Sequence, residues 1–273
     1  MNPFNEKSQI VAGIDVGSAM TKVVILEAKE IIAQAISPTL ADPRLAAKLA
    51  LEKALQEVNL SQNDLDFIVT TGYGRRTVEF GNQVITEITA NAKGVRFLGS
   101  PLGQVRTVID LGAQDSKVIK LNENGEVTDF IMNEKCAAGT GRFLEVMART
   151  LDIPLEDLGE FSLKSKNPIK INATCTVFAE SEVISLIAQR EKKEDILAGL
   201  HKVIAKRIVD LAKVITSKEV VFFDGGGAKN IGIKKALEEE LGVKIYVSPE
   251  PQFVIALGAA LIASELLHAN ARS

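Results

Sequence analysis

The spacing of apolar and polar positions changes repeatedly along the chain and predicts alternating strands and helices. Short apolar runs between turn-forming residues predict strands, at residues 9–15, 20–26, 30–36, 66–70, 105–110, 116–121, 126–131, 219–224 and 243–247. Apolar residues at helical spacing predict helices, at residues 43–58, 141–151, 180–190, 193–216 and 253–268. This alternation is typical of an α/β protein.

The chain also contains an internal repeat. Residues 14–26 read IDVGSAMTKVVIL and residues 109–121 read IDLGAQDSKVIKL, and they align without a gap when 95 is added to the first numbering. Both copies share Ile-Asp-apolar-Gly and a later Lys-Val. We therefore expect each copy to form a strand that ends in aspartate, a glycine-containing turn and a second, antiparallel strand.

The repeat predicts two α/β lobes, each starting with a hairpin. The Gly-Ser-Pro-Leu-Gly-Gln stretch at residues 99–104 is the expected boundary. We assign residues 1–100 to an N-terminal lobe and residues 101–273 to a C-terminal lobe. The last helix, about 253–268, is expected to pack back toward the boundary.

The two turns carry residues suited to a polyphosphate. Glycine lets a turn's backbone N–H groups come close to a phosphate. The candidate binding residues are Gly17, Ser18, Ala19, Met20, Thr21 and Lys22 in the first turn and Gly112, Ala113 and Gln114 in the second. Asp15 and Asp110, at the strand ends, are placed to hold hydrated Mg²⁺ against the phosphates. Gln114 or Asp115 is placed to orient an attacking water.

A third glycine-rich segment follows the apolar run at residues 220–223. Gly225, Gly226 and Gly227 precede Ala228 and a helix that begins near Asn230. Bare backbone there admits a flat ring or a phosphate, although a flexible strand-to-helix turn would also explain the glycines. Gln252 is a further candidate for contact with a nucleotide. The chain has no P-loop spacing.

Composition narrows the partners. The net charge of −3 and the pI near 5.6 offer no basic surplus for nucleic acid. The most apolar stretch, residues 253–267, is shorter than a membrane span of roughly 20 residues and contains Glu265. With no export signal at the N-terminus we expect a cytoplasmic protein that contacts neither nucleic acid nor membrane.

The two cysteines, Cys136 and Cys175, each precede a predicted helix by a few residues. A helix N-terminus favours the thiolate. A [4Fe–4S] cluster needs four thiolates, which two copies of the chain would supply at a dyad. A zinc ion between two copies needs the same number of ligands, and a buried cysteine can also be a simple small hydrophobe.

Taken in order, the two turns and the glycine segment resemble the phosphate-1, phosphate-2 and adenosine motifs of the actin, sugar-kinase and Hsp70 superfamily. The resemblance implies two RNase-H-like lobes with ATP in the cleft between them. It also implies hinge closure coupled to the nucleotide.

The cysteine segments resemble a narrower group, the ATP-dependent activators of 2-hydroxyacyl-CoA dehydratases in the BadF/BadG/BcrA/BcrD ATPase family. The matching segments are GIDVGSAMTK, TGYGRR, VIDLGAQDSK, NEKCAAGTGRFLE and TCTVFAESEVISL. The resemblance implies that Cys136 and Cys175 hold one [4Fe–4S] cluster per homodimer. It implies ATP-coupled transfer of an electron from ferredoxin or flavodoxin to a dehydratase or a benzoyl-CoA reductase.

Three departures separate the chain from many relatives of this group: Ala113 in place of glycine, Asp224 in place of a small hydroxyl residue, and Ala90-Asn91 in place of Cys-His. Two alternatives explain the ATP motifs without the cysteines, namely a small-molecule or acyl-phosphate kinase and an actin-like scaffold. Tyr73, Arg75 and Arg76 of TGYGRR either line a site, bind a partner or form a structured loop. Glu180 is expected to support the loop before Cys175, and His201 to be a packing residue.

Overall fold

The computed structural model describes residues 9–133, 137–172, 175–212 and 220–270. The chain divides into two compact units. Unit 1 consists of residues up to Leu98 together with the segment from Phe253 onward, and unit 2 runs from Gly99 to Gln252.

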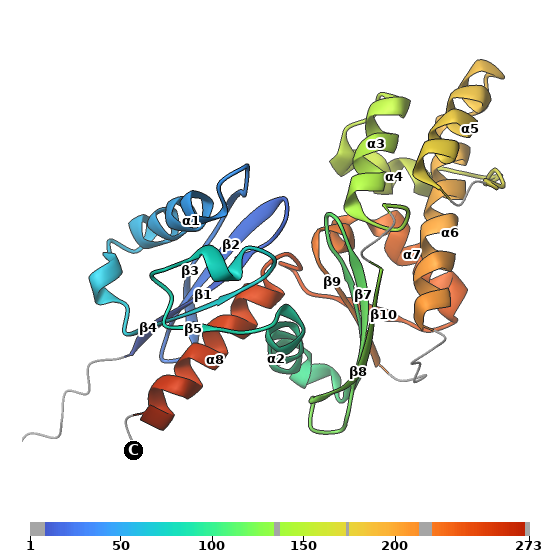
Figure 1. Ribbon diagram of the computed structural model, residues 1–273. Coiled ribbons are helices and arrows are strands. Elements are labelled where there is room, and N and C mark those ends of the chain that lie inside the picture. The colour runs from blue at the N-terminus through green and yellow to red at the C-terminus, as the bar shows by residue number, and fades with distance from the viewer. Residues whose placement is uncertain (1–8, 134–136, 173–174, 213–219, 271–273) are drawn as a thin grey trace, which may run out of the picture. The chain divides into compact units, whose positions relative to one another are not determined.

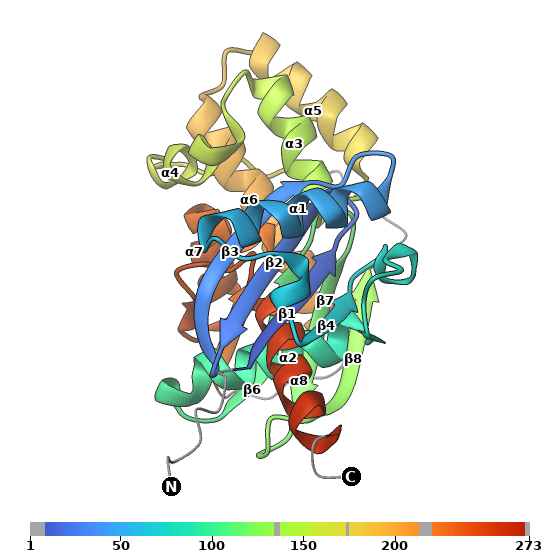
Figure 2. The same cartoon turned by 90° about the vertical axis from the view of Figure 1, so that its left-hand side faces the viewer.

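Unit 1 has a five-stranded mixed sheet in the order β3-β2-β1-β4-β5 (Figure 1). Its strands are β1 (Ile10–Val16), β2 (Met20–Glu27), β3 (Glu30–Pro38), β4 (Phe67–Thr71) and β5 (Gln83–Val84). Its helices are α1 (Pro43–Glu57), α2 (Glu87–Gly99) and α8 (Val254–Asn270), and α2 ends at the first residue of unit 2. Helix α1 covers one face of the sheet and α8 crosses the other (Figure 2).

Alternation along β1 explains this layering, because neighbouring side chains of a strand point to opposite faces. Ile14 packs on the side of α1, and Val11 packs on the side of α8. Gly13 lies directly beneath α8, where an added Cβ would be 2.1 Å from the carbonyl oxygen of Ala256. Because Gly13 has no side chain, helix α8 can pack directly against strand β1.

Helices α2 and α8 also cross at small residues. A Cβ on Gly258 would lie 1.7 Å from the carbonyl oxygen of Ala90, and one on Gly94 would lie 2.1 Å from that of Val254. Ala90 and Asn91 are both buried at this crossing. The Ala90-Asn91 departure therefore falls on a tight helix contact.

Unit 2 repeats the topology of unit 1 in the order β10-β9-β6-β7-β8. Its strands are β6 (Val105–Leu111), β7 (Ser116–Leu121), β8 (Val127–Asn133), β9 (Val220–Asp224) and β10 (Ile245–Val247). Its helices are α3 (Gly141–Leu151), α4 (Leu158–Leu163), α5 (Thr176–Ala188), α6 (Lys193–Ala212) and α7 (Ile231–Leu241). Strands β6 to β9 thus take the places of β1 to β4, and β10 that of β5.

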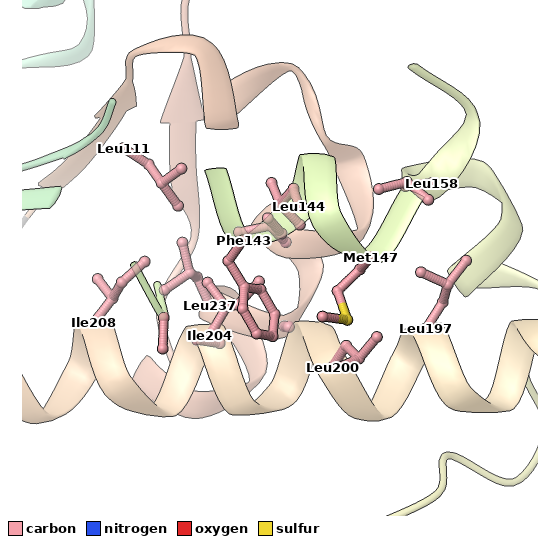
Figure 3. Close-up of a cluster of buried hydrophobic side chains, with 14 of the residues drawn as sticks. Leu111, Phe143, Leu144, Met147, Leu158, Leu197, Leu200, Ile204, Ile208 and Leu237 are labelled. Carbon is pink, nitrogen blue, oxygen red and sulfur yellow. The ribbon is translucent and has the colours of Figure 1, made fainter. Parts of the chain in front are cut away.

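The main core of unit 2 lies between its sheet and these helices. Phe143 and Met147 of α3 point toward Leu200 and Ile204 of α6 (Figure 3). Their spacing of four residues puts them on one face of α3. All four side chains are buried, so α3 is fixed along its length against the longest helix of the unit.

The sequence repeat is also a repeat of strand register. Asp15 pairs with Lys22 across β1 and β2, and Asp110 pairs with Lys117 across β6 and β7. The parallel neighbour of Asp15 is Thr71, and that of Asp110 is Asp224. The two copies therefore place the same aspartate–lysine pair in the same register, whereas the parallel neighbour of the aspartate differs.

Most predicted elements are confirmed within a few residues, with four differences. Helices α2 and α4 and the short strand β5 were not predicted; α4 has six residues and β5 has two. The predicted spacing in α1 rested partly on Leu45 and Leu49, which are half-exposed, whereas the buried side is mostly alanine. None of the described helices is both long and apolar enough to cross a membrane.

Candidate functional site

The first turn (residues 17–20) connects β1 and β2 of unit 1. The N–H of Gly17 donates to the carbonyl of Met20 at 3.2 Å and closes the turn. A Cβ on Gly17 would lie 2.8 Å from that carbonyl oxygen, so the turn needs glycine. The N–H groups of Ser18 and Ala19 make no hydrogen bond among the described residues. They are the donors that this turn can offer to an anion.

Thr21 supports this turn from inside. It is fully buried, and its hydroxyl lies 2.9 Å from that of Thr39. The Thr39 hydroxyl donates to the carbonyl of Gly17 at 2.8 Å, and the Thr39 N–H donates to the carbonyl of Ala19. In the described structure the Thr21 side chain therefore holds the turn rather than facing a ligand, while the predicted contact of Thr21 with a nucleotide stays untested.

The second turn (residues 112–115) connects β6 and β7 of unit 2 in the same way. The N–H of Gly112 donates to the carbonyl of Asp115 at 3.0 Å. The N–H groups of Ala113 and Gln114 make no hydrogen bond among the described residues, and Gln114 is exposed. This turn presents the same donors as the first, with an amide side chain beside them.

Each strand end carries a buried aspartate paired with lysine. Lys22 Nζ lies 2.8 Å from Asp15 Oδ2, and Lys117 Nζ lies 3.1 Å from Asp110 Oδ2. Lys117 also contacts Asp115 Oδ1 at 2.7 Å, and its side chain is only 3% exposed. In unit 1 one carboxylate is thus paired with one ammonium group, whereas in unit 2 two carboxylates share the ammonium group of Lys117.

The N-terminus of helix α3 donates hydrogen bonds to the first two residues of the second turn. The N–H of Gly141 donates to the carbonyl of Gly112, and the N–H of Arg142 donates to that of Ala113, both at 2.8 Å. These N–H groups belong to the first turn of a helix and have no partner inside it. The helix that follows the Cys136 segment is thus anchored directly to the second turn.

The glycine loop (residues 225–228) follows β9, as the sequence predicts. Gly225 has φ of +78°, and its N–H donates to the carbonyl of Pro251. Gly227 and Ala228 are buried, whereas Gly226 is exposed. An added Cβ on Gly226 would lie 3.5 Å from Gln252 Nε2. The structure thus brings Gln252 and the exposed glycine together within unit 2.

His201 supports the end of this loop from the core. Asn230 caps α7 by accepting from the N–H groups of Gly232 and Ile233, and its Nδ2 lies 3.2 Å from His201 Nε2. Burial lowers the pKa of His201 to about 3. The imidazole is therefore neutral, and the prediction of a packing residue is confirmed.

Cys175 is the residue immediately before α5. It is a free thiol, half-buried, and it occupies the N-cap position without a side-chain capping bond. Cys136 lies outside the described residues. Among the described residues no three histidine, cysteine or acidic side chains lie close enough to hold a metal ion. One chain alone therefore offers one described thiol at the start of a 13-residue helix.

Two acidic residues of α5, Glu180 and Glu182, make contacts that differ from the one expected of Glu180. Glu182, not Glu180, supports the loop before Cys175, since its carboxylate accepts the N–H of Asn172 at 3.2 Å. Glu180 instead accepts from the Thr150 hydroxyl on α3 at 3.3 Å. The expectation for Glu180 was wrong because helical geometry turns it toward α3.

Comparisons with known proteins show the family to which the chain belongs. The model of the BadF/BadG/BcrA/BcrD ATPase family matches residues 12–263. The chain belongs to this family. The (R)-2-hydroxyglutaryl-CoA dehydratase activating ATPase of Acidaminococcus fermentans is 44% identical to it over 253 residues, which cover 92% of this chain and 95% of that protein.

Solved structures agree at the level of the fold. The activator of the 2-hydroxyisocaproyl-CoA dehydratase from Clostridium difficile, with bound ADPNP, has a TM-score of 0.92 at 41% identity and covers 97% of both chains. A glucokinase from Streptomyces griseus has a TM-score of 0.57 at 13% identity, covering 94% of this chain and 99% of that one, and shares the fold alone. The predicted family, its ATPase class and the α/β fold with two mixed sheets are thereby confirmed, while the roles of individual residues stay predictions.

Proposed function

We propose that this chain hydrolyses ATP and couples hydrolysis to delivery of an electron to a 2-hydroxyacyl-CoA dehydratase or a benzoyl-CoA-reductase-like partner. One observation carries the proposal. Two strand ends repeat the same glycine turn with the same aspartate–lysine pair, and each turn offers backbone N–H groups that suit a phosphate. Membership in the BadF/BadG/BcrA/BcrD family supports ATP as that polyphosphate.

In this proposal the N–H groups of Ser18, Ala19, Ala113 and Gln114 bind phosphate oxygens. Backbone donors beside glycine form the anion-binding concavities common in nucleotide sites. Gln114 orients the attacking water, because its amide is exposed whereas the carboxylate of Asp115 is bound to Lys117. The glycine loop and Gln252 contact the adenosine.

The aspartates fit a hydrated magnesium ion. In both Asp15 and Asp110 the lysine contacts Oδ2, and Oδ1 makes no hydrogen bond or ion pair among the described residues. Carboxylate oxygens are ligands that Mg²⁺ prefers, directly or through its waters. When bound, Mg²⁺ would neutralise charge on the β- and γ-phosphates.

Cys175 fits a ligand of a [4Fe–4S] cluster shared by a homodimer, with Cys136 as the second thiolate of each chain. Cys175 lies at the N-terminus of α5, where the helix dipole favours a negatively charged group. Val177 and Phe178, just after Cys175, are 66% and 69% exposed. Large apolar side chains so exposed favour a protein interface there. The bound cluster would supply a one-electron carrier, reduced by ferredoxin or flavodoxin in the cytoplasm.

A covalent and hydrogen-bonded path links the second turn to both cysteine segments. The turn is bonded to the start of α3, five residues after Cys136, and α3 is bonded to α5 through Thr150 and Glu180. A change in the second turn on ATP binding would therefore reach the start of α3 and, through α3, helix α5. The partner would bind only one of the two resulting states, which is how ATP would affect transfer.

The decisive experiment is anaerobic purification followed by counts of iron and sulfide. We expect about four of each per dimer, with brown colour, for the unmodified protein. Cys136→Ser and Cys175→Ser should lose the iron, whereas Ala188→Ser at the exposed end of α5 should keep it. ATP turnover without the partner should survive in both cysteine variants.

Two other outcomes would favour the alternatives. Colourless protein that phosphorylates a small acceptor would indicate a kinase without a cluster. Colourless protein that forms ATP-dependent filaments would indicate an actin-like scaffold. Either result would leave nucleotide binding intact and remove the redox part of the proposal.

A further inference from the structure

The tyrosine loop (residues 72–76, GYGRR) occupies in unit 1 the place that the glycine loop occupies in unit 2. Gly72 has φ of +86° and Gly225 has φ of +78°. A Cβ on Gly72 would lie 2.4 Å from Asp15 Oδ1, and one on Gly225 would lie 2.4 Å from Asp110 Oδ1. An added Cβ on either glycine would also lie close to the carbonyl oxygen of the residue that follows the aspartate, at 2.7 Å and 2.6 Å. The two loops are therefore structural equivalents at the carboxyl ends of their sheets.

The tyrosine loop is held firmly against the end of β1. The N–H of Gly74 donates to the carbonyl of Val16 at 2.9 Å, and a Cβ on Gly74 would lie 2.6 Å from Val16 Cγ1. Gly72 and Gly74 are buried, but Tyr73 between them is 82% exposed. The loop thus presents a solvent-exposed aromatic side chain near Asp15 and the first turn.

The two arginines of the loop have different settings. Arg75 Nη1 donates to the carbonyl of Gly72 at 2.9 Å, and the Arg75 carbonyl accepts from the Thr70 hydroxyl. Arg75 therefore stabilises the loop. Arg76 is exposed and makes no hydrogen bond or ion pair with the described residues. Its positive charge remains available at this edge of the sheet.

The first turn of unit 1 has no uncompensated lysine charge to offer a phosphate, because Lys22 is paired with Asp15. A planar guanidinium matches two phosphoryl oxygens at once. Ligands of open α/β sheets bind outside the carboxyl ends of the strands, which is where this loop lies.

We propose that Arg76 is a catalytic residue that binds the γ-phosphoryl group of ATP, with the Tyr73 hydroxyl as a second donor to it. This rests on the proposed ATPase function. In the step it serves, the oxygen of a water bonds to the γ-phosphorus. The bond to the β,γ-bridging oxygen breaks, ADP keeps the electron pair, and one proton leaves to solvent. Arg76 stabilises the charge on the three γ-oxygens during this transfer.

The test compares Arg76→Ala, Arg76→Lys and Tyr73→Phe with Arg96→Ala, an exposed arginine of α2 in the same unit. Turnover of ATP is measured together with binding of ADP and of a non-hydrolysed ATP analogue by calorimetry. We expect Arg76→Ala to lower kcat about 100-fold and to weaken the ATP analogue roughly tenfold, with ADP binding unchanged within about twofold. Arg76→Lys should recover part of both losses, Tyr73→Phe should show a smaller loss, and Arg96→Ala should match the unmodified protein.

Unchanged turnover in Arg76→Ala and Arg76→Lys would overturn this inference, and so would equal weakening of ADP and the ATP analogue. If Arg76→Ala fails to fold, the selective loss of analogue binding in Arg76→Lys decides the matter. A chain that binds no nucleotide even when unmodified would instead overturn the proposed function itself.

Discussion

The first and second turns share a scaffold and differ in their polar side chains. Asp15–Lys22 and Asp110–Lys117 are the same cross-strand pair built twice. Position 19 is alanine in the first turn, and its equivalent in the second is Gln114; position 20 is methionine, and its equivalent is Asp115. The repeat thus accounts for the shape of both turns. The differences put a second carboxylate and an exposed amide on unit 2 alone.

The turns are also anchored differently. The carbonyl of Gly17 accepts from the Thr39 hydroxyl, in the coil that follows β3. The equivalent carbonyl of Gly112 accepts from the N–H of Gly141, at the start of α3. One turn is therefore bonded within its own hairpin region, whereas the other is bonded to a helix that adjoins a cysteine segment. In the proposed function both turns bind phosphate, and the second is the one linked by hydrogen bonds to the helix that follows a cysteine segment.

The largest effect should come from removing the lysines. Lys117→Met removes the counterion that the buried Asp110 shares with the partly exposed Asp115, which should cost about 3–5 kcal/mol of unfolding free energy. Lys22→Met removes the counterion of one buried carboxylate, that of Asp15, and should cost less, about 1–3 kcal/mol. Urea unfolding followed by circular dichroism measures both. Equal losses would mean that the extra carboxylate of unit 2 has no electrostatic consequence.

Gln114→Ala should lower the kcat of ATP hydrolysis about 100-fold, because it removes the group that orients the water. Steady-state turnover with ADP binding as a control separates this from lost affinity. Adding Ala19→Gln to the same chain should not restore turnover, since the proposed function places the attacking water at the second turn. Recovery in the double variant would show that the two turns are interchangeable.

The anchors can be separated by a pair of smaller changes. Thr39→Val removes the hydroxyl bonds to Gly17 and Thr21 and should cost about 1–2 kcal/mol of stability. Gly141→Ala places a Cβ 3.1 Å from the Gly112 carbonyl oxygen and should weaken ATP binding roughly fivefold, about 1 kcal/mol. Thermal unfolding and calorimetry measure the two effects. An unaltered iron-dependent electron transfer in Gly141→Ala would argue against signalling through α3.

The last prediction concerns the core of unit 2, which holds a buried histidine, whereas His268 of unit 1 is exposed. Burial lowers the pKa of His201 to about 3 in the folded protein, against 6.5 ordinarily. The unfolded chain therefore binds more protons at acidic pH, and stability is lost as the pH falls below about 6.5. Unfolding midpoints from pH 7 to 5 should fall less steeply in His201→Gln. An identical slope would contradict the role of His201.

Some of this was accessible from patterns alone. Short apolar runs between turn residues and the offset of 95 located the strands, both turns and the equivalence of Asp15 with Asp110, because these are local features of the chain. The link between the tyrosine loop and the glycine loop was not accessible. TGYGRR and DGGG share only two glycines, and the parallel pairing with β1 and β6 is what makes them equivalent.

What the sequence by itself determined is the alternating α/β pattern, the repeat, the two cysteines before helices and the family that these indicate. These are properties of nearby residues, which the order of side chains records. Only the tertiary structure decided which lysine is buried, that Glu182 rather than Glu180 holds the loop before Cys175, and that α3 is bonded to the second turn. The last two features depend on contacts between residues about 10 to 30 positions apart, where the orientation of the chain rather than sequence spacing selects the partner.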